Sequence, residues 1–297
     1  MTEETSKTPN FVLGVGAQKA GTTWLFQYLN AHPDCAMGPV KEMGFFTDPR
    51  IAAHNAINDD RANKHMLRAA KILSRKGKLN AAATERLVGL LDAITARVQP
   101  DRYVEFYRRI VDANPHTKLI GDITPEYSGL HPDDIVGMKD FLDEMGYPVK
   151  VVFLMRDPVT RSFSAARMKD RVISAKNGNK KPNHSGDGFV SFATSKPCIA
   201  RTRYEKSIPA LERAFGADQI FYGIHEDFFN AAEVKRLCDF LGIPFIEPSL
   251  DVRVNAGKEE KSYSEAQAAE VRDFYADTYA FCRDRFGAER IDKLWTA

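Results

Sequence analysis

The stretch that decides the fold is FVLGVGAQKAGTTWLFQYLN, residues 11–30. Its apolar beginning, residues 11–15, is typical of a buried β-strand, and its second half carries apolar residues at helical spacing. A loop that contains Gly16 and Gly21 connects the two. Strand, glycine loop and helix form an arrangement that binds phosphate, because loop amides and the helix dipole favour an anion at one place.

The positive charge in this loop stands at an unusual position. Gly16 and Gly21 have the spacing of a kinase P-loop, in which a lysine follows the second glycine directly. Here Thr22 takes that place, and the lysine is Lys19, in the middle of the loop. An ordinary glycine turn is the alternative, but the order Lys, Gly, Thr, Thr is uncommon in such turns. The loop therefore predicts an anion site that differs from that of a nucleotide kinase.

A second phosphate-binding pattern lies in VVFLMRDPVTRSFSAARMK, residues 151–169. Its apolar start predicts a central parallel strand, and Arg156 follows at the edge where open α/β sheets bind ligands. Ser164 lies about two helical turns further on. An arginine fork and a serine hydroxyl both suit a phosphate. Taken singly they would be read as a structural arginine and a solvent-facing serine, but beside the Lys19 loop a second phosphate site is the better interpretation.

The two patterns together resemble the sulfotransferases that use 3′-phosphoadenosine 5′-phosphosulfate (PAPS), and among them the heparan-sulfate-type and bacterial members. The resemblance joins the first loop to the family's 5′-phosphosulfate loop and residues 156–164 to its 3′-phosphate motif. It implies PAPS as co-substrate, no metal, and a cofactor-binding set made of Gln18, Lys19, Ala20, Gly21, Thr22, Thr23, Trp24, Arg156 and Ser164. Residues 257–263 loosely match a closing loop of the family, so Lys258 and Lys261 are further candidates, with a solvated charge run as the alternative.

KEMGFF, residues 41–46, is similar to the K-E-x-x-F-F segment of the same family. There the glutamate is the proposed general base, so the resemblance implies that Glu42 is catalytic together with Lys19. A base works best in a partly dry pocket that raises its pKa, and Phe45 and Phe46 are expected to provide one. The alternative is a surface glutamate that pairs with Lys41.

GDITPEY, residues 121–127, resembles the family's E-K-T-P-x-Y segment, whose threonine, proline and tyrosine all match. Asp122 replaces the glutamate and Ile123 replaces the lysine, which argues against an acceptor of the heparan type. Asp122 could orient an acceptor, bond to a loop or be a buried structural carboxylate. With Phe46, it is a candidate for the acceptor side, and the acceptor is expected to be a small molecule or a glycan.

Strands and helices alternate through most of the chain, which predicts an α/β fold of the three-layer, P-loop-like kind, with a central parallel sheet flanked by helices. The 297 residues suit a single domain, residues 8–297, with a helical insertion at about 55–115. Further helices are predicted at 204–215 and 231–241, with a strand at 220–224 between them. One long amphipathic helix is predicted at about 265–286.

The composition argues against several classes of function. A net charge of +2 is too small to indicate binding to nucleic acid or to a membrane surface, so neither is expected as a partner. The chain shows no signal segment and no stretch of about 18 apolar residues. The four cysteines lack C-x-x-C spacing and indicate reduced thiols, neither a zinc site nor a disulfide framework. A cytoplasmic enzyme is therefore expected.

The sequence predicts in-line transfer of a sulfuryl group from PAPS to a hydroxyl or amine acceptor. In this hypothesis Lys19 neutralises charge at the bridging oxygen and Glu42 takes the acceptor proton. One alternative is a nucleotide-dependent kinase of the P-loop fold, since residues 119–122 faintly resemble a Walker B strand end. The other is a non-catalytic nucleotide-binding protein on the same fold, against which the presence of both Lys19 and Glu42 argues.

Overall fold

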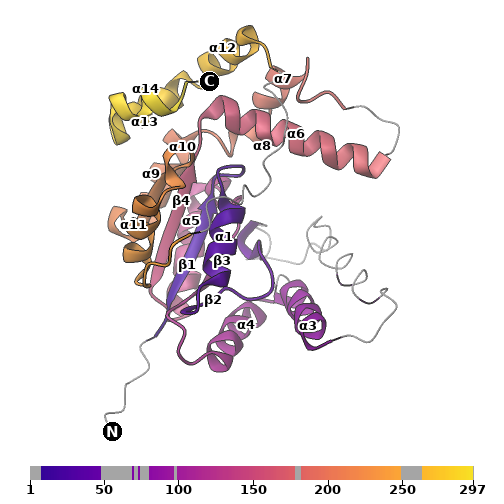
Figure 1. Ribbon diagram of the computed structural model, residues 1–297, viewed down its shortest axis with the longest axis vertical. Helices are drawn as coiled ribbons and strands as arrows, with labels where there is room; N and C mark the ends of the chain where they lie inside the picture. The colour runs from indigo at the N-terminus through magenta and orange to yellow at the C-terminus, as the bar shows by residue number, and fades with distance from the viewer. Residues whose placement is uncertain are drawn as a thin grey trace.

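A five-stranded parallel sheet organises the molecule (Figure 1). The computed structural model describes residues 8–47, 69, 73, 80–96, 99–177, 182–248 and 263–296. The strands are β1 (Asn10–Gly16), β2 (Cys35–Ala36), β3 (Leu119–Ile123), β4 (Val149–Met155) and β5 (Ile220–Ile224). Their order across the sheet is β2-β3-β1-β4-β5, and every neighbouring pair is parallel. The central pair, β1 and β4, has the nearly continuous apolar sequence that a strand covered on both faces requires.

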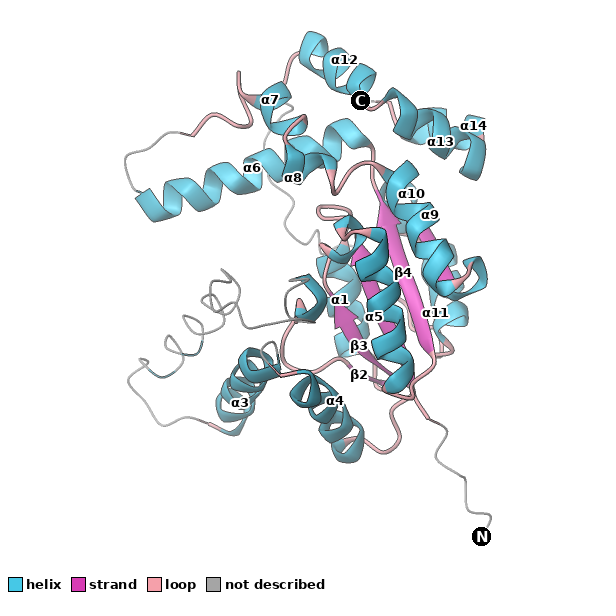
Figure 2. Cartoon of the chain, turned by 180° about the vertical axis from the view of Figure 1, so that it is seen from behind, coloured by secondary structure: helices cyan, strands magenta, loops and turns pink. Residues whose placement is uncertain are grey.

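Helices cover both faces of this sheet. α1 (Thr22–Ala31) lies in front of it in Figure 1, and α5 (Pro132–Glu144) lies in front of it in Figure 2, which shows the molecule from behind. α9 (Tyr204–Phe215) packs beside α5, and α11 (Ala231–Leu241) contacts β5. The chain winds from β1 through α1 to one side and from β3 through α5 to the other. The predicted three-layer α/β fold is thereby confirmed.

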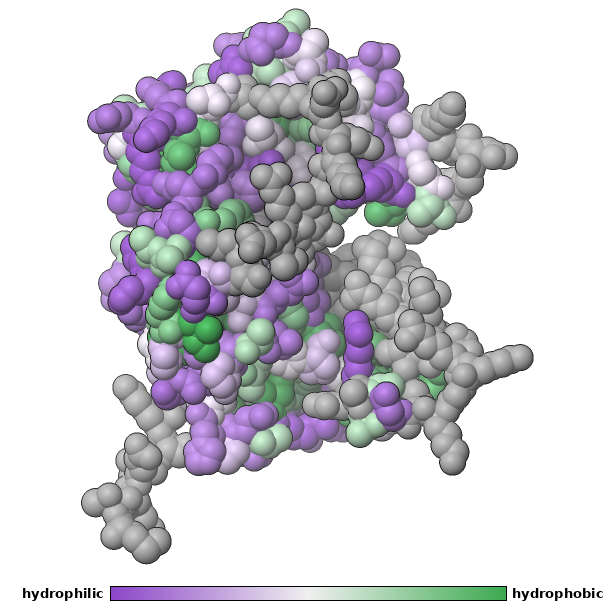
Figure 3. Space-filling model, viewed as in Figure 1, coloured by the Kyte–Doolittle hydropathy of each residue, from purple (hydrophilic) through white to green (hydrophobic). Residues whose placement is uncertain are grey.

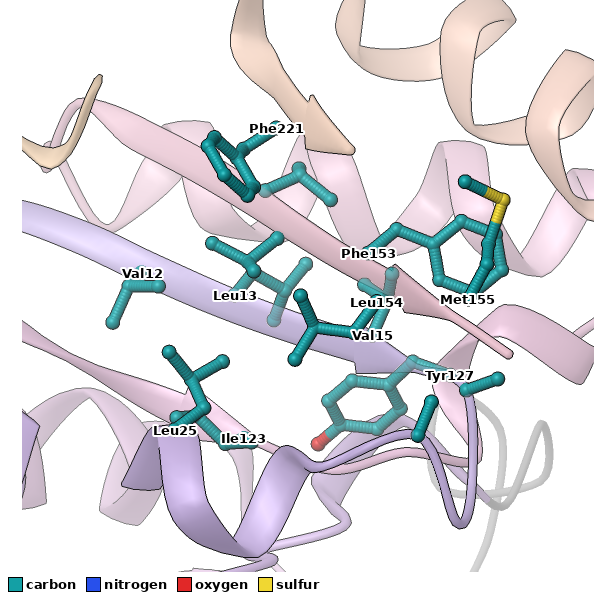
Figure 4. Packing of buried hydrophobic residues seen from close by; sticks show 14 of the residues in the cluster. Val12, Leu13, Val15, Leu25, Ile123, Tyr127, Phe153, Leu154, Met155 and Phe221 are labelled. Carbon is teal, nitrogen blue, oxygen red and sulfur yellow. The ribbon is translucent and has the colours of Figure 1, made fainter. Parts of the chain in front are cut away.

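The core lies between the sheet and these helices. Val12, Leu13 and Val15 of β1 are fully buried together with Phe153 of β4 and Leu25 of α1 (Figure 4). Burying one side chain of this size stabilises the fold by about 1.5–3 kcal/mol. The carboxyl ends of β1 and β4, where the two predicted phosphate sites begin, are therefore firmly placed relative to each other.

α6 (Pro158–Asn177) follows β4 and runs across the carboxyl edge of the sheet (Figure 1). Asp157 caps its beginning, since one carboxylate oxygen accepts from the amide of Thr160 at 2.9 Å. Pro158 stands at the first helical position, where its missing N–H costs nothing. The remaining helices near this edge are α7 (Phe189–Ala193), α8 (Lys196–Ile199), α10 (His225–Phe228), α12 (Glu265–Phe274), α13 (Ala276–Phe286) and α14 (Ala288–Leu294).

The predicted single helix at 265–286 is wrong, because α12 and α13 are separate. The chain turns at Tyr275, whose φ of −101° and ψ of 19° are not helical. The Tyr275 hydroxyl donates to the carbonyl of Ala193 at 2.6 Å, which ties the turn to α7. This tie comes from a residue 82 positions away, so the helical pattern of the segment does not reveal it.

In the region of the predicted insertion, α3 (Ala81–Ala96) packs against α4 (Pro100–Ala113), and α4 contacts β3. The earlier part of that region lies largely outside the described residues, so the insertion and the single-domain boundaries stay predictions. The face in Figure 3 shows apolar side chains in small groups among hydrophilic ones.

Within the described ranges, no helix combines the length and the apolar character needed to cross a membrane. The same part of the chain contains no group of three or more His, Cys, Asp or Glu side chains placed to hold a metal ion. All four cysteines are free thiols.

Candidate active site

The glycine loop leads from the carboxyl end of β1 into α1. Gly21 is the N-cap residue of α1 and has a φ of 100°, and among the described residues no side chain caps the helix. A Cβ atom at this position would lie 2.6 Å from the ring of Phe229, so the loop needs glycine here both for its backbone angle and for space. The N–H groups of the first helical turn are left without helical partners, an arrangement that favours a bound anion.

Lys19 lies in this loop as a partly buried cation. Burial, followed by the positive charges of Arg171, Arg156, Lys41 and Arg167, lowers the pKa of Lys19 to about 8. Within the part of the chain that the structure describes, Lys19 forms no ion pair with a carboxylate. A bound anion would relieve the repulsion between these cations as well as attract each of them.

The two predicted phosphate motifs meet at Arg156. Its guanidinium donates from Nη1 to the carbonyl oxygen of Lys19 at 3.1 Å, across 137 positions of sequence. Its Nε donates to the hydroxyl of Thr160 at 3.1 Å, and Tyr204 bonds to its backbone. Ser164 is half-buried one turn beyond Thr160, on the same side of α6, and no hydrogen bond between described residues joins it to Arg156.

Trp24 supports the beginning of α1 from one side. Its ring stacks on Tyr28 with centroids 5.3 Å apart and meets the edge of Phe229 at 5.4 Å. Thr22 is buried beside it, whereas Thr23 and Gln18 are half-buried in the loop, and Ala20 is fully buried. The other two cofactor candidates, Lys258 and Lys261, lie outside the described residues.

A second loop, residues 41–47, carries the predicted base. Lys41 donates a hydrogen bond to Glu42 Oε1, the pairing that the sequence left open as the alternative. The Glu42 side chain is 39% exposed. Phe45 stacks on Tyr103 with centroids 4.4 Å apart, and Phe46 meets the rings of Tyr103 and Tyr127 edge to face.

Asp122 holds this loop from beneath. Its side chain is 2% exposed, and four donors surround its two oxygens: Met43 N at 3.2 Å, Thr124 Oγ1 at 2.7 Å, Tyr127 OH at 2.5 Å and Tyr103 OH at 3.3 Å. The amide of Gly44 donates to Thr124 Oγ1 at 3.0 Å. Of the roles left open for Asp122, the structure therefore supports a buried carboxylate that bonds to the loop.

Backbone strain singles out the same two residues that the sequence nominated as catalytic. Lys19 has a φ of 75° and Glu42 a φ of 66°, and they are the two non-glycine residues with left-handed backbone among the residues described. This conformation costs roughly 1–3 kcal/mol per residue and collects at functional sites. The strain is an observation independent of any sequence motif.

Sequence reasoning missed Arg161 and His225, which lie next to the glycine loop, and Thr160, which accepts a hydrogen bond from Arg156. Burial, together with Arg156 and Lys19, lowers the pKa of His225 to about 4, so its imidazole is neutral at pH 7. Arg161 is fully buried, and its guanidinium reaches the carbonyl of Gln18 at 3.4 Å. Helical spacing after Arg156 could have suggested Thr160, but no local pattern points to His225.

A parallel sheet whose first strand leads into a glycine loop, bonded to an arginine that follows the neighbouring strand, is an α/β arrangement suited to an anion. The sulfotransferase family profile matches residues 9–247. Because this match covers most of the 297 residues, the chain belongs to the sulfotransferase family.

One solved structure supports this fold, and two further sulfotransferase domains are similar at lower TM-scores. A sulfotransferase from Alicyclobacillus acidocaldarius is 20% identical, with a TM-score of 0.56 over 97% of this chain and 96% of that one. The sulfotransferase domain from the curacin biosynthetic pathway is 16% identical, with a TM-score of 0.48 over 89% and 83% of the two chains. The sulfotransferase domain of the Synechococcus PCC 7002 olefin synthase is 15% identical, with a TM-score of 0.45 over 93% and 98%. No curated protein matches the chain significantly.

Proposed function

We propose that this chain transfers a sulfuryl group from PAPS to a hydroxyl or amine group of an acceptor. The observation that carries the proposal is the hydrogen bond from Arg156 to the carbonyl of Lys19, at 3.1 Å. It brings two basic sites, each suited to a phosphate, to one edge of the sheet. A nucleotide with separate 3′- and 5′-phosphate groups matches such a pair.

The residues present fit this nucleotide. PAPS supplies an activated sulfuryl group whose leaving group is a phosphate. In the proposal, the loop amides and the hydroxyls of Thr22 and Thr23 bind the 5′-phosphosulfate, and Lys19 neutralises charge at the bridging oxygen. Arg156 and Ser164 hold the 3′-phosphate. With a pKa of about 8, Lys19 is protonated at neutral pH, as this role requires.

Glu42 is the better candidate for the base than Asp122. An acceptor must reach the carboxylate, and Glu42 is 39% exposed while Asp122 is 2% exposed. The four donors around Asp122 already use its oxygens. A general base must accept a proton from the acceptor, and the partly exposed carboxylate of Glu42 beside Lys41 is placed to do so. In the proposal, Asp122 affects the reaction only by holding in place the loop that carries Glu42. The proposal requires no metal ion.

The first test compares two nucleotides by calorimetry. Adenosine 3′,5′-bisphosphate should bind much more tightly than adenosine 5′-monophosphate, because only the former fills both sites. Arg156→Ala should remove most of this difference, about 2–4 kcal/mol for a charged contact. Arg236→Ala is a matched control, since Arg236 lies on α11 and pairs with Glu233.

Equal affinities of the wild-type protein for the two nucleotides would overturn the proposal. Tight magnesium-dependent binding of ATP would instead favour a kinase. Tight binding of the bisphosphate without turnover on any acceptor would favour a nucleotide-binding protein. Each of the three functions therefore predicts a different result.

A further inference from the structure

Arg161 is a fully buried arginine to which the proposed mechanism gives no role. Its Nη1 donates to the carbonyl of Gln18 at 3.4 Å, and its Nη2 donates to Ser162 Oγ at 3.3 Å and to Cys198 Sγ at 2.7 Å. Its Nε has no hydrogen-bond partner among the residues that the structure describes. Among the described residues, no carboxylate lies within ion-pair distance of it. Burying a guanidinium without a carboxylate costs roughly several kcal/mol, so its presence calls for a reason.

The environment of the loop carbonyls supplies that reason. Arg161 bonds to the carbonyl of Gln18, and Arg156 bonds to the carbonyl of the next residue, Lys19. In a trans peptide the carbonyl and the following N–H point in opposite directions. Holding the Gln18 carbonyl toward α6 therefore turns the N–H of Lys19 away from α6.

We propose that Arg161 is a positioning residue that holds the glycine loop in its anion-binding conformation through the carbonyl of Gln18. The inference rests on the proposed function, in which this loop binds the 5′-phosphosulfate. Arg161 also places a full positive charge behind the loop, in the protein interior, where solvent and salt screen it weakly. An anion in the loop compensates a charge that no carboxylate of the described residues pairs with.

Two variants separate the hydrogen bond from the charge. Arg161→Met removes both, while Arg161→Lys keeps the charge and loses the fork that reaches several partners at once. Calorimetry would use adenosine 3′,5′-bisphosphate, which needs the loop, and adenosine 3′-monophosphate, which does not. We expect Arg161→Met to weaken binding of the bisphosphate by about 10- to 100-fold, the usual effect of losing a charge-assisted hydrogen bond. Binding of the 3′-monophosphate should stay nearly unchanged. Arg161→Lys should fall between this variant and the wild type.

Tyr222→Phe is the control, because it removes a side-chain hydrogen bond to Glu212 and contacts neither Arg161 nor its described partners. Thermal unfolding of all variants measures the cost to the fold. If Arg161→Met weakens the binding of both nucleotides equally, or of neither, Arg161 is only structural and the inference is overturned. If Arg161→Met does not fold, Arg161→Lys decides by the same comparison between the two nucleotides.

The outcomes also separate this inference from the proposed function. If the wild-type protein fails to prefer the bisphosphate over adenosine 5′-monophosphate, the function itself fails. If the wild type shows that preference and Arg161→Met retains it in full, only the role of Arg161 fails.

Discussion

The two loops at the carboxyl edge of the sheet are built on opposite electrostatic principles. In the loop proposed to bind the nucleotide, residues 16–21, here called the nucleotide-side loop, arginines hold the backbone carbonyls, and Lys19 is surrounded by further cations. In the loop proposed to face the acceptor, residues 41–47, here called the acceptor-side loop, an acid and a hydroxyl hold the backbone amides, and Lys41 already pairs with Glu42. The first loop exposes unbalanced positive charge, whereas the second presents a carboxylate whose charge is balanced.

This difference predicts how each loop responds to change. The free nucleotide-side loop carries repulsion that a bound anion relieves, so changes there should alter both affinity and rate. In the acceptor-side loop, Lys41 also repels Lys19 but is paired with Glu42, so changes to Glu42 should alter mainly the rate. A change at Glu42 that weakened nucleotide binding, or a change at Lys19 that altered only the rate, would contradict this difference between the loops.

The largest effect is expected for Glu42→Gln. Glutamine keeps the shape of the side chain but cannot accept the acceptor's proton, so turnover should fall by about 10²–10⁴-fold. Binding of adenosine 3′,5′-bisphosphate should hardly change. Steady-state kinetics and calorimetry on the same preparation check both statements. Near-normal turnover, with the acidic limb of the pH–rate profile retained, would assign the base to another group, with Asp122 the first to examine.

The next effect concerns Lys19→Ala. The charge of Lys19 matters most when negative charge develops on the leaving phosphate, so kcat should fall by about 10²–10³-fold, more than KM for PAPS rises. An unchanged kcat with only a raised KM would make Lys19 a simple anchor.

The same variant should also raise the stability of the free protein. The pKa of Lys19 is lowered in the fold, so below about pH 8 folding must keep a proton on a group that the fold prefers neutral. That cost disappears above the unfolded value of 10.5. Thermal unfolding at pH 7 should therefore show a higher Tm for the variant, and an equal or lower Tm would contradict the argument.

Much of the fold could be predicted from sequence because its signals are local. β5, α9 and α11 have the predicted bounds, since apolar spacing alone identifies them. The break at Tyr275 could not be predicted, because it depends on a contact with Ala193 on another helix.

The site residues also divide into those that local sequence predicts and those whose role depends on distant contacts. The sequence places Lys19 and Arg156 each after its strand, and the geometry of parallel strands brings them to one edge. It leaves the role of Asp122 open, because the tyrosines that surround it come from separate segments. It gives no indication that Arg161 turns inward to the loop, since one arginine in a helix can point to solvent or to the core.

Asp122→Asn tests the support of the acceptor-side loop. The asparagine amide offers only one oxygen to the four donors, so the free energy of unfolding should fall by about 1–3 kcal/mol. kcat should fall with KM for PAPS unchanged, because the loop that carries Glu42 loosens. Tyr103→Phe, which removes only the donor at 3.3 Å, should lower the free energy of unfolding and kcat by less. A rise in KM for PAPS without a change in kcat would place Asp122 on the nucleotide side instead.

The smallest effect is the pH dependence of nucleotide binding, and it belongs to the nucleotide-side loop alone. A bound anion favours protonated Lys19, so binding takes up a proton once the free lysine has begun to lose its own. With a pKa of about 8, affinity for adenosine 3′,5′-bisphosphate should be level near pH 7 and weaken by about tenfold by pH 9. His225 does not contribute in this window, because its pKa is about 4. Lys19→Arg keeps its charge throughout and should abolish the dependence. A wild-type affinity that stays level to pH 9, or an equal slope in Lys19→Arg, would mean that the unbalanced charge of this loop does not rest on Lys19.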